Sequence, residues 1–299
     1  IYTSQVGRSD KQGQVTISGE FAIGGIIAYA DASSTCANAF IDCRVFSNVT
    51  IKRTGDTNAS AYGLPYGTAI GGIVGETDLD MFGCINDGEV SHSCLLSPLR
   101  ISYLGELATS RFDVGGIAGL VDAREVGAIF TTCENNGPLS IKAKYGIPRI
   151  TFMDWSNGHA IGINIGGITG STFGLDYAGE EVKFESCYNK ESGTLYLYHT
   201  ETNLVPDDNN TGFCTVAGIV GSGGTGSFNK CQNLGLLKAD CLVSGTPAPS
   251  SMKRRNYLIG VGGIVGYGWD SWKEIASCQN KGNIEVEYYG TNNSSGNYR

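Results

Sequence analysis

The chain has little of what helices, membrane spans and catalytic sites are usually built from. It has no sustained apolar spacing of three and four residues, so an α-helical fold is not expected. It has no apolar run near the roughly 20 residues that cross a bilayer, which argues against direct membrane insertion. Only three histidines occur among 299 residues, His92, His159 and His199, and none has a motif-spaced partner. We expect each to be a surface or loop residue rather than a general base.

Basic residues are also scarce, with 21 Lys and Arg against 29 Asp and Glu and a formal net charge of −8. Such a charge opposes unspecific attraction to phosphate backbones, so nucleic acid is not an expected partner. The ten cysteines include no Cys-x-x-Cys pair, which disfavours a zinc site, and no cofactor is expected. Proline is rare, with 7 residues, whereas 44 glycines punctuate short Val, Ile, Tyr and Thr runs. This pattern predicts an all-β chain.

One pattern is present six times along the chain. Its first half is a diglycine before an apolar run, at Gly24–Gly25, Gly71–Gly72, Gly115–Gly116, Gly166–Gly167, Ala217–Gly218, where alanine stands first, and Gly262–Gly263. Its second half begins with a cysteine, at Cys43, Cys84, Cys133, Cys187, Cys231 and Cys278. An asparagine follows two residues later in the last five copies, at Asn86, Asn135, Asn189, Asn233 and Asn280. In the first copy Val45 stands at the asparagine position.

The first positions of successive diglycines differ by 47, 44, 51, 51 and 45 residues, a period that is typical of a solenoid or a propeller. We predict a parallel β-helix (β-solenoid) of six repeats, forming one domain over 1–299. The repeat cores are expected near 21–51, 70–94, 114–144, 165–198, 216–243 and 261–289. A six-bladed β-propeller is the alternative, although the Tyr and Trp positions of kelch blades do not recur. A lean coil takes roughly 22 residues, so the surplus in each repeat forms either a second coil or loops.

In a β-helix, equivalent positions of successive repeats lie about 4.8 Å apart. The six repeated cysteines would then form a column of buried free thiols, because parallel side chains suit a disulfide badly. Any disulfide would involve the other four cysteines, Cys36, Cys94, Cys214 and Cys241. The asparagines would form a ladder of amide hydrogen bonds, which satisfies polar groups that are costly to bury unpaired. The diglycines would allow another backbone or a core side chain to approach closely.

The sequence GGIVG followed by Cys-x-Asn-x-Gly resembles the GLUG repeat of bacterial surface proteins, including immunoglobulin A peptidases and large adhesins. The resemblance covers all six units. It implies a right-handed β-helix, a bacterial cell-surface or secreted setting and, frequently, adhesion. Two copies depart from the motif, the first at Val45 and the fifth at Ala217, so we expect less regular coils there. The chain begins at Ile1 rather than Met, and we expect a processed or trimmed form.

Aromatic residues in two loop-like segments suggest a ligand site. Trp269, Asp270 and Trp272 lie in Gly-Trp-Asp-Ser-Trp, and Trp155 lies in a similar segment. Flat rings beside polar groups can stack on sugars, although the same rings could also cover the end of the helix or pack a loop. We predict a non-enzymatic adhesion or binding module for an extracellular glycan or a host or matrix protein. A polysaccharide-degrading enzyme and a non-binding structural stalk of a larger surface protein are the alternatives.

Acidic pairs offer a weaker signal for calcium, because carboxylate oxygens are its preferred ligands. We expect these acids to lie in loops, where the pairs Asp78 with Asp80 and Asp207 with Asp208 either carry solvated charge or bind calcium weakly.

Overall fold

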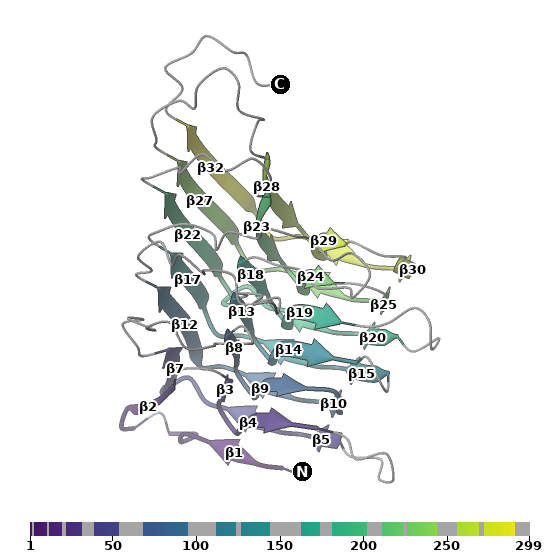
Figure 1. Cartoon of the computed structure of the whole chain (residues 1–299). Coiled ribbons are helices and arrows are strands. Elements are labelled where there is room, and N and C mark those ends of the chain that lie inside the picture. The colour runs from purple at the N-terminus through teal and green to yellow at the C-terminus, as the bar shows by residue number, and fades with distance from the viewer. Residues whose placement is uncertain are drawn as a thin grey trace, which may run out of the picture.

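Stacked parallel β-strands make up the described part of the chain. The computed structural model describes residues 1, 3–10, 12–19, 22–31, 39–53, 68–94, 112–123, 127–143, 163–173, 181–201, 211–223, 226–243, 256–268 and 272–290. These residues contain 32 strands and no helix, and therefore no helix able to span a membrane. The strands stack in chain order from the N-terminal to the C-terminal part of the chain (Figure 1).

The strands form five parallel sheets, which we number I to V in the order in which each repeat visits them. Sheet I contains β3 (Ile23–Gly24), β8 (Thr68–Gly71), β13 (Phe112–Gly115), β18 (Ile163–Gly166), β23 (Thr211–Ala217) and β28 (Asn256–Gly262). Sheet II contains β4 (Ile27–Ala30), β9 (Val74–Thr77), β14 (Ala118–Asp122), β19 (Thr169–Phe173), β24 (Val220–Gly223) and β29 (Val265–Gly268). Sheet III contains β5 (Ala39–Ile41), β10 (Asp80–Phe82), β15 (Ala128–Thr131), β20 (Val182–Glu185), β25 (Gly226–Asn229) and β30 (Trp272–Ala276).

The other two sheets have one strand more, because they include the strands that precede the first full repeat. Sheet IV contains β1 (Gln5–Val6), β6 (Arg44–Val45), β11 (Ile85–Asn86), β16 (Glu134–Asn135), β21 (Tyr188–Asn189), β26 (Gln232–Asn233) and β31 (Gln279–Asn280). Sheet V contains β2 (Val15–Gly19), β7 (Val49–Arg53), β12 (Glu89–Cys94), β17 (Leu139–Ala143), β22 (Leu195–Glu201), β27 (Leu237–Val243) and β32 (Ile284–Gly290).

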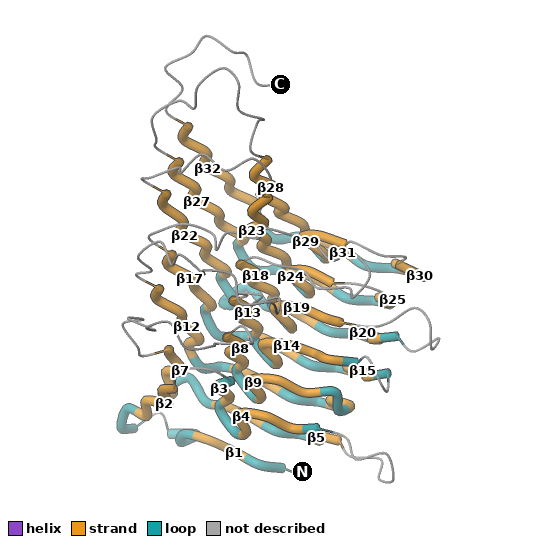
Figure 2. The backbone as a smooth tube through the Cα atoms, in the orientation of Figure 1, coloured by secondary structure: helices purple, strands orange, loops and turns teal. Residues whose placement is uncertain are grey.

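Each repeat forms one coil of five strands. Strand neighbours within a sheet come from consecutive repeats, so no second coil lies between them. Figure 2 shows these strands in orange and the described connections between them in teal. The predicted parallel β-helix of six repeats is therefore confirmed, and the propeller is excluded. The fifth coil is regular despite Ala217, which is in register with Gly166 and Gly262.

The corner between sheets III and IV has a backbone conformation that sequence reasoning missed. The residue before each repeated cysteine has a positive φ of 50° to 60°, in Asp42, Gly83, Thr132, Ser186, Lys230 and Ser277. Only Gly83 among these is free of the steric cost that a Cβ imposes in this region. The corner amides bond to the next coil; for example, the N–H of Thr132 donates to the carbonyl of Glu185 at 2.9 Å. Repetition of these bonds holds the strained corner in place.

The core is built from columns of equivalent side chains, one from each coil. A column missed at the sequence level lies three residues before the cysteines, in Phe40, Met81, Phe130, Phe184, Phe228 and Ile275. Its rings stack along the axis, with centroids 5.1 Å apart in both Phe130–Phe184 and Phe184–Phe228. The column is buried through Phe228, whereas Ile275 in the last described coil is 54% exposed.

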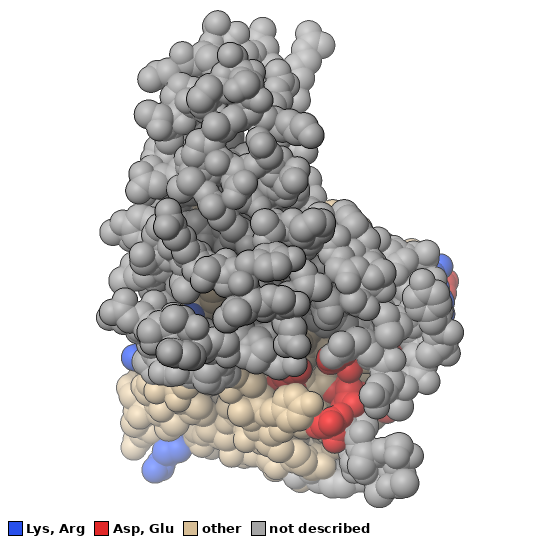
Figure 3. Space-filling model, viewed as in Figure 1, with Lys and Arg blue, Asp and Glu red and all other residues tan. Residues whose placement is uncertain are grey.

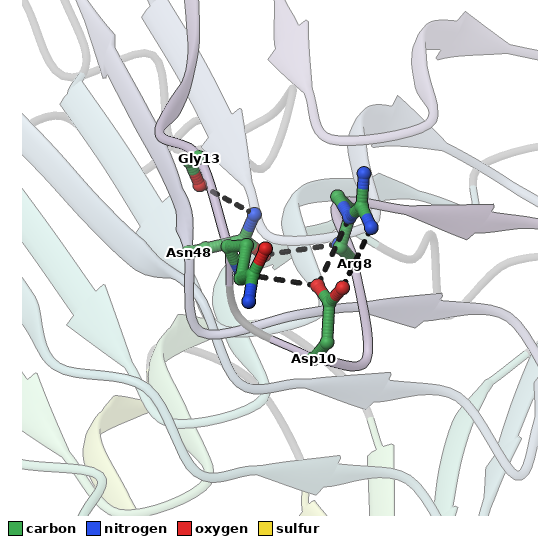
Figure 4. Close-up of polar contacts among 5 residues, drawn as sticks. Arg8, Asp10, Gly13 and Asn48 are labelled. Atoms are coloured by element: carbon green, nitrogen blue, oxygen red, sulfur yellow. Dashed lines mark hydrogen bonds and ion pairs between the residues drawn. The ribbon is translucent and has the colours of Figure 1, made fainter.

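Asn48 of the first coil hydrogen-bonds to the turn between β1 and β2 (Figure 4). The Asn48 amide Nδ2 donates to the carbonyl of Gly13 at 2.8 Å, and the N–H of Arg8 donates to Asn48 Oδ1 at 3.1 Å. The exposed Arg8–Asp10 ion pair, at 2.6 Å, closes the same turn. Asn48 itself is buried, so its two bonds also satisfy a polar group removed from water.

Candidate functional site

The six repeated cysteines form the predicted column of free thiols. The column lies at the corner between sheets III and IV. The thiols donate to carbonyls rather than joining in disulfides; that of Cys133, for example, lies 3.4 Å from the carbonyl oxygen of Met81 in the preceding coil. Burial raises the pKa of Cys133 and Cys187 well above the ordinary thiol value. Because the thiolate is the reactive form, these cysteines are built for packing and not for nucleophilic chemistry.

The predicted asparagine ladder is also present. The side-chain Nδ2 of each asparagine donates to Oδ1 of the asparagine in the next coil, from Asn86 through Asn280, at 2.6 to 3.0 Å. Each Nδ2 also donates to the carbonyl of the following glycine, for example from Asn135 to Gly137 at 3.0 Å. Val45 is buried at the same place in the first coil, so the ladder begins at Asn86.

A second buried polar column, missed at the sequence level, runs through sheets I and II. Asp113 Oδ1 accepts from Asn164 Nδ2 at 2.9 Å and from Ser171 Oγ at 2.5 Å. Thr215 Oγ1 continues the column by donating to Asn164 Oδ1 at 2.7 Å. All four side chains are buried, so this network satisfies its own polar groups and does not offer them to a ligand.

Sheet V offers the best-developed polar and aromatic surface. Along β22 the side chains of Leu195, Leu197 and His199 are buried, whereas those of Tyr196 and Tyr198 lie on the other face and are half-buried. The two tyrosine rings lie with their centroids 6.4 Å apart and their planes inclined by 41°. This alternation follows directly from the two-residue period of a strand.

Asp240 in the neighbouring strand β27 organises this surface. Its Oδ2 accepts from the Tyr196 hydroxyl at 2.8 Å and lies 3.5 Å from Lys238 Nζ. Lys238 also lies over the Tyr196 ring, 5.7 Å from its centroid. Burial and the bond to Asp240 raise the pKa of Tyr196 to about 12, so its hydroxyl stays protonated and donates. We call Tyr196, Tyr198, Lys238 and Asp240 the sheet V cluster.

Comparison of the chain with protein-family models, curated proteins and solved structures found no match.

The tryptophan site predicted from the sequence lies almost wholly outside the described residues. Trp155, Trp269 and Asp270 are not among them. The backbone of Trp272 begins β30 and is paired with Gly226 of β25, which places this residue in sheet III. Sequence reasoning chose these residues for their rings in polar segments. The tyrosines of β22 also combine rings with polar neighbours, and they were missed because they lie in a strand rather than in a polar loop-like segment.

The calcium candidates are only partly described. Asp207 and Asp208 fall outside the described residues, whereas Asp80 lies in strand β10 and Asp78 is buried. The expected loop placement is therefore wrong for Asp80, whereas Asp78 lies in the connection between β9 and β10 but is buried there rather than solvated. Asp80 Oδ1 accepts from the N–H of Ile129 at 2.8 Å, so this carboxylate links two coils. Within the part of the chain that is described, no three His, Cys, Asp or Glu side chains form a metal-binding group.

Acidic side chains gather in the N-terminal part of the face seen in Figure 3. Tyr29 in sheet II has four acidic neighbours, whose charges add to the effect of partial burial and raise its pKa: Asp31, Glu76, Asp78 and Asp122. Tyr29 is 58% exposed, and its face differs from that of the sheet V cluster.

The histidine prediction is wrong for two of the three residues. His92 in β12 and His199 in β22 are buried, because both occupy inward positions of sheet V strands. His92 packs edge-on against Phe112, with centroids 4.9 Å apart. Burial lowers the pKa of His199 to about 4, so its imidazole is neutral at neutral pH. His159 lies outside the described residues.

Two of the four cysteines outside the repeat are also placed. Cys214 and Cys241 are buried free thiols, so no disulfide joins them. Cys241 is the register partner of His199, and burial raises its pKa to about 12. This Cys–His pair therefore holds both groups neutral, the opposite of what a thiolate–imidazolium nucleophile requires. The side chains of Cys36 and Cys94 lie outside the description.

Proposed function

We propose that the chain is a bacterial cell-surface or secreted binding module, which presents the outer face of sheet V to an extracellular glycan or to a host or matrix protein. The observation that carries this proposal is a continuous outward column with one residue from each of the seven strands of sheet V. It consists of Ser18, Lys52, Ser91, Ser140, Tyr196, Lys238 and Glu285. A stack of coils turns such columns into an extended surface that suits an extended partner.

The interior supports this proposal by making the surface rigid. The asparagine ladder, the stacked rings and the parallel sheets run through successive coils, so the outer side chains are held at fixed spacings. A surface that is already ordered loses little conformational entropy when a ligand binds.

The proposed setting rests on the resemblance to GLUG repeats. The buried thiols are compatible with this setting, because a high pKa and lack of solvent contact protect cysteines from oxidation. Membership of that repeat family is likewise a proposal, which the regular Gly-Gly and Cys-x-Asn-x-Gly positions support.

One observation favours a second candidate, an enzyme that acts on polysaccharide. Asp240 and Glu287 are register partners on the outer face of sheet V, beside the tyrosines. Glycoside hydrolases use two carboxylates that flank the scissile bond, about 5 to 10 Å apart. Release of reducing ends from polysaccharides incubated with the chain would support this candidate over simple binding.

The proposal is tested by screening the whole chain against immobilised glycans, mucin and matrix proteins. A face variant combines Lys142→Ala with Lys238→Ala, and a matched control combines Lys183→Ala in sheet III with Lys190→Ala directly after strand β21 of sheet IV. We expect the wild type and the control to bind one class of ligand and the face variant to bind it more weakly. Binding to none of these ligands would overturn the proposal and favour a structural stalk.

A further inference from the structure

We propose that the sheet V cluster is a binding site for uncharged glycans, in which Tyr196 and Tyr198 hold sugar rings and Asp240 accepts their hydroxyls. This inference rests on the proposed function, since it names the ligand class and its place on the stack. Three features of the cluster carry it: the paired rings, the organised carboxylate and the balance of charge.

The paired rings provide the surface on which sugars stack. Tyr196 and Tyr198 are two residues apart in one strand, so their side chains leave the same face of sheet V side by side. Aromatic rings attract the C–H-bearing faces of pyranoses through dispersion and the hydrophobic effect. Because the pair lies along β22, a bound oligosaccharide would cross the axis of the stack and place adjacent sugar rings over Tyr196 and Tyr198.

The carboxylate of Asp240 supplies the polar contact. Its Oδ2 is held by the Tyr196 hydroxyl and by Lys238, which fixes the orientation of the group. Its Oδ1 is covered and has no hydrogen-bond partner. Covered acceptors in proteins nearly always have a donor, and a sugar hydroxyl would supply one. Lys238 and the Tyr196 hydroxyl both contact the other oxygen, Oδ2, so Oδ1 is the acceptor left for the ligand.

The balance of charge around the rings selects an uncharged ligand. Lys142 and Lys238 lie beside Asp240, Glu285 and Glu287 on the same face. An anionic polysaccharide would meet three carboxylates here, and an unpaired like charge at an interface is a strong barrier to binding. A neutral chain meets no such barrier and uses both signs of charge as hydrogen-bonding groups.

The test measures the affinity of the whole chain for short neutral oligosaccharides of glucose, mannose and galactose, with heparin and polygalacturonate as anionic comparisons. The variants are Tyr198→Ala, Tyr196→Phe and Asp240→Asn. The matched control is Tyr29→Ala, which removes an exposed tyrosine from sheet II. Circular dichroism and thermal melting establish that each variant is folded.

We expect a neutral oligosaccharide to bind, with Tyr198→Ala weakening it roughly tenfold through loss of a stacking ring. Tyr196→Phe and Asp240→Asn should also weaken it, whereas Tyr29→Ala should bind as the wild type does. Neutral glycan binding that survives Tyr198→Ala and Asp240→Asn overturns this site and leaves the proposed function standing. Binding of a protein or an anionic glycan alone overturns the ligand class. Binding to no glycan and no protein overturns both proposals together.

Discussion

The side chain of Asn135 lies directly against the backbone of Gly116, so closely that a Cβ at Gly116 would come within 2.5 Å of Asn135 Cγ. The two residues belong to the two halves of one repeat, the diglycine and the Cys-x-Asn-x-Gly segment. Their contact explains why the halves occur together, because the second glycine of the pair makes room for the ladder asparagine. In the first coil Gly25 faces Val45 instead, so a valine side chain fills the space beside the glycine where the ladder asparagine is absent.

This contact predicts that Gly116→Ala is strongly destabilising. The added methyl group meets the Asn135 amide and the backbone carbonyl of Gly167, and Asn135 cannot move without breaking the ladder. We expect a loss of about 3 kcal/mol in the free energy of unfolding, at the upper end of overpacking effects. Urea titration measures it. Gly19→Ala is the control, because its Cβ would meet only the Ile23 side chain at 3.2 Å; equal losses in both variants would contradict the explanation.

The ladder itself predicts a difference between its interior and its last member. Asn135→Ala removes the amide that donates to Asn189 and Gly137 and the oxygen that accepts from Asn86. All three hydrogen bonds are buried. We expect this to cost about 3 kcal/mol, since buried polar groups lose their partners. Asn280→Ala should cost less than about 1 kcal/mol, because Asn280 is exposed and water can replace its bonds. Denaturant midpoints for the two variants provide the comparison, and an interior variant as stable as the terminal one would exclude a stabilising ladder.

The strained corner before the cysteines predicts a stabilising substitution. Thr132 is exposed, has a β-branched side chain and adopts a φ of 52°. Thr132→Gly should raise the free energy of unfolding by up to about 1 kcal/mol, because the steric cost of the Cβ exceeds the entropy lost by glycine. The reverse change, Gly83→Thr, introduces that cost and a contact with Asp42 Oδ1. Thermal melting should therefore shift upward for the first variant and downward for the second; the same sign in both would refute the strain.

Features of this fold could be predicted from the sequence where the same residue type recurs in each repeat, and they were missed where it does not. The cysteine and asparagine ladders, and the close approach at the diglycines, were predicted because the same residue types recur in each copy. The corner before the cysteines was missed because Asp42, Gly83 and Thr132 share a backbone angle and no side-chain chemistry. The ring column was obscured by Met81 and Ile275, which replace phenylalanine at two of its positions.

The candidate site was harder to predict than the fold, because it is not repeated. Tyr196 and Asp240 occupy different columns in neighbouring coils, and only the register of β22 and β27 brings them together. The buried histidines were misplaced for a related reason. His199 alternates with the outward, half-buried tyrosines in β22, and its polar character concealed an inward position that the two-residue period assigns correctly.

Buried His199 predicts a loss of stability in mild acid. Its pKa is about 4 in the folded chain, below the value of about 6.5 expected when unfolded. The unfolded chain therefore binds more protons between these values, and the stability that is fully present above pH 6.5 is lost as the pH falls toward 4. The loss should approach about 3 kcal/mol. Unfolding measured from pH 7 to pH 4 should show a flatter dependence in His199→Leu; identical profiles would show that His199 does not cause it.

The most direct test of the functional account is amide hydrogen exchange, measured by mass spectrometry with and without a saturating mixture of short neutral oligosaccharides. Parallel strands buried inside the stack should exchange slowly in both conditions. The account predicts added protection concentrated in β22 and β27, where Tyr196, Tyr198 and Asp240 lie. Protection confined to sheet II around Tyr29, or no protection in any described strand, would contradict the assignment of the binding surface to sheet V.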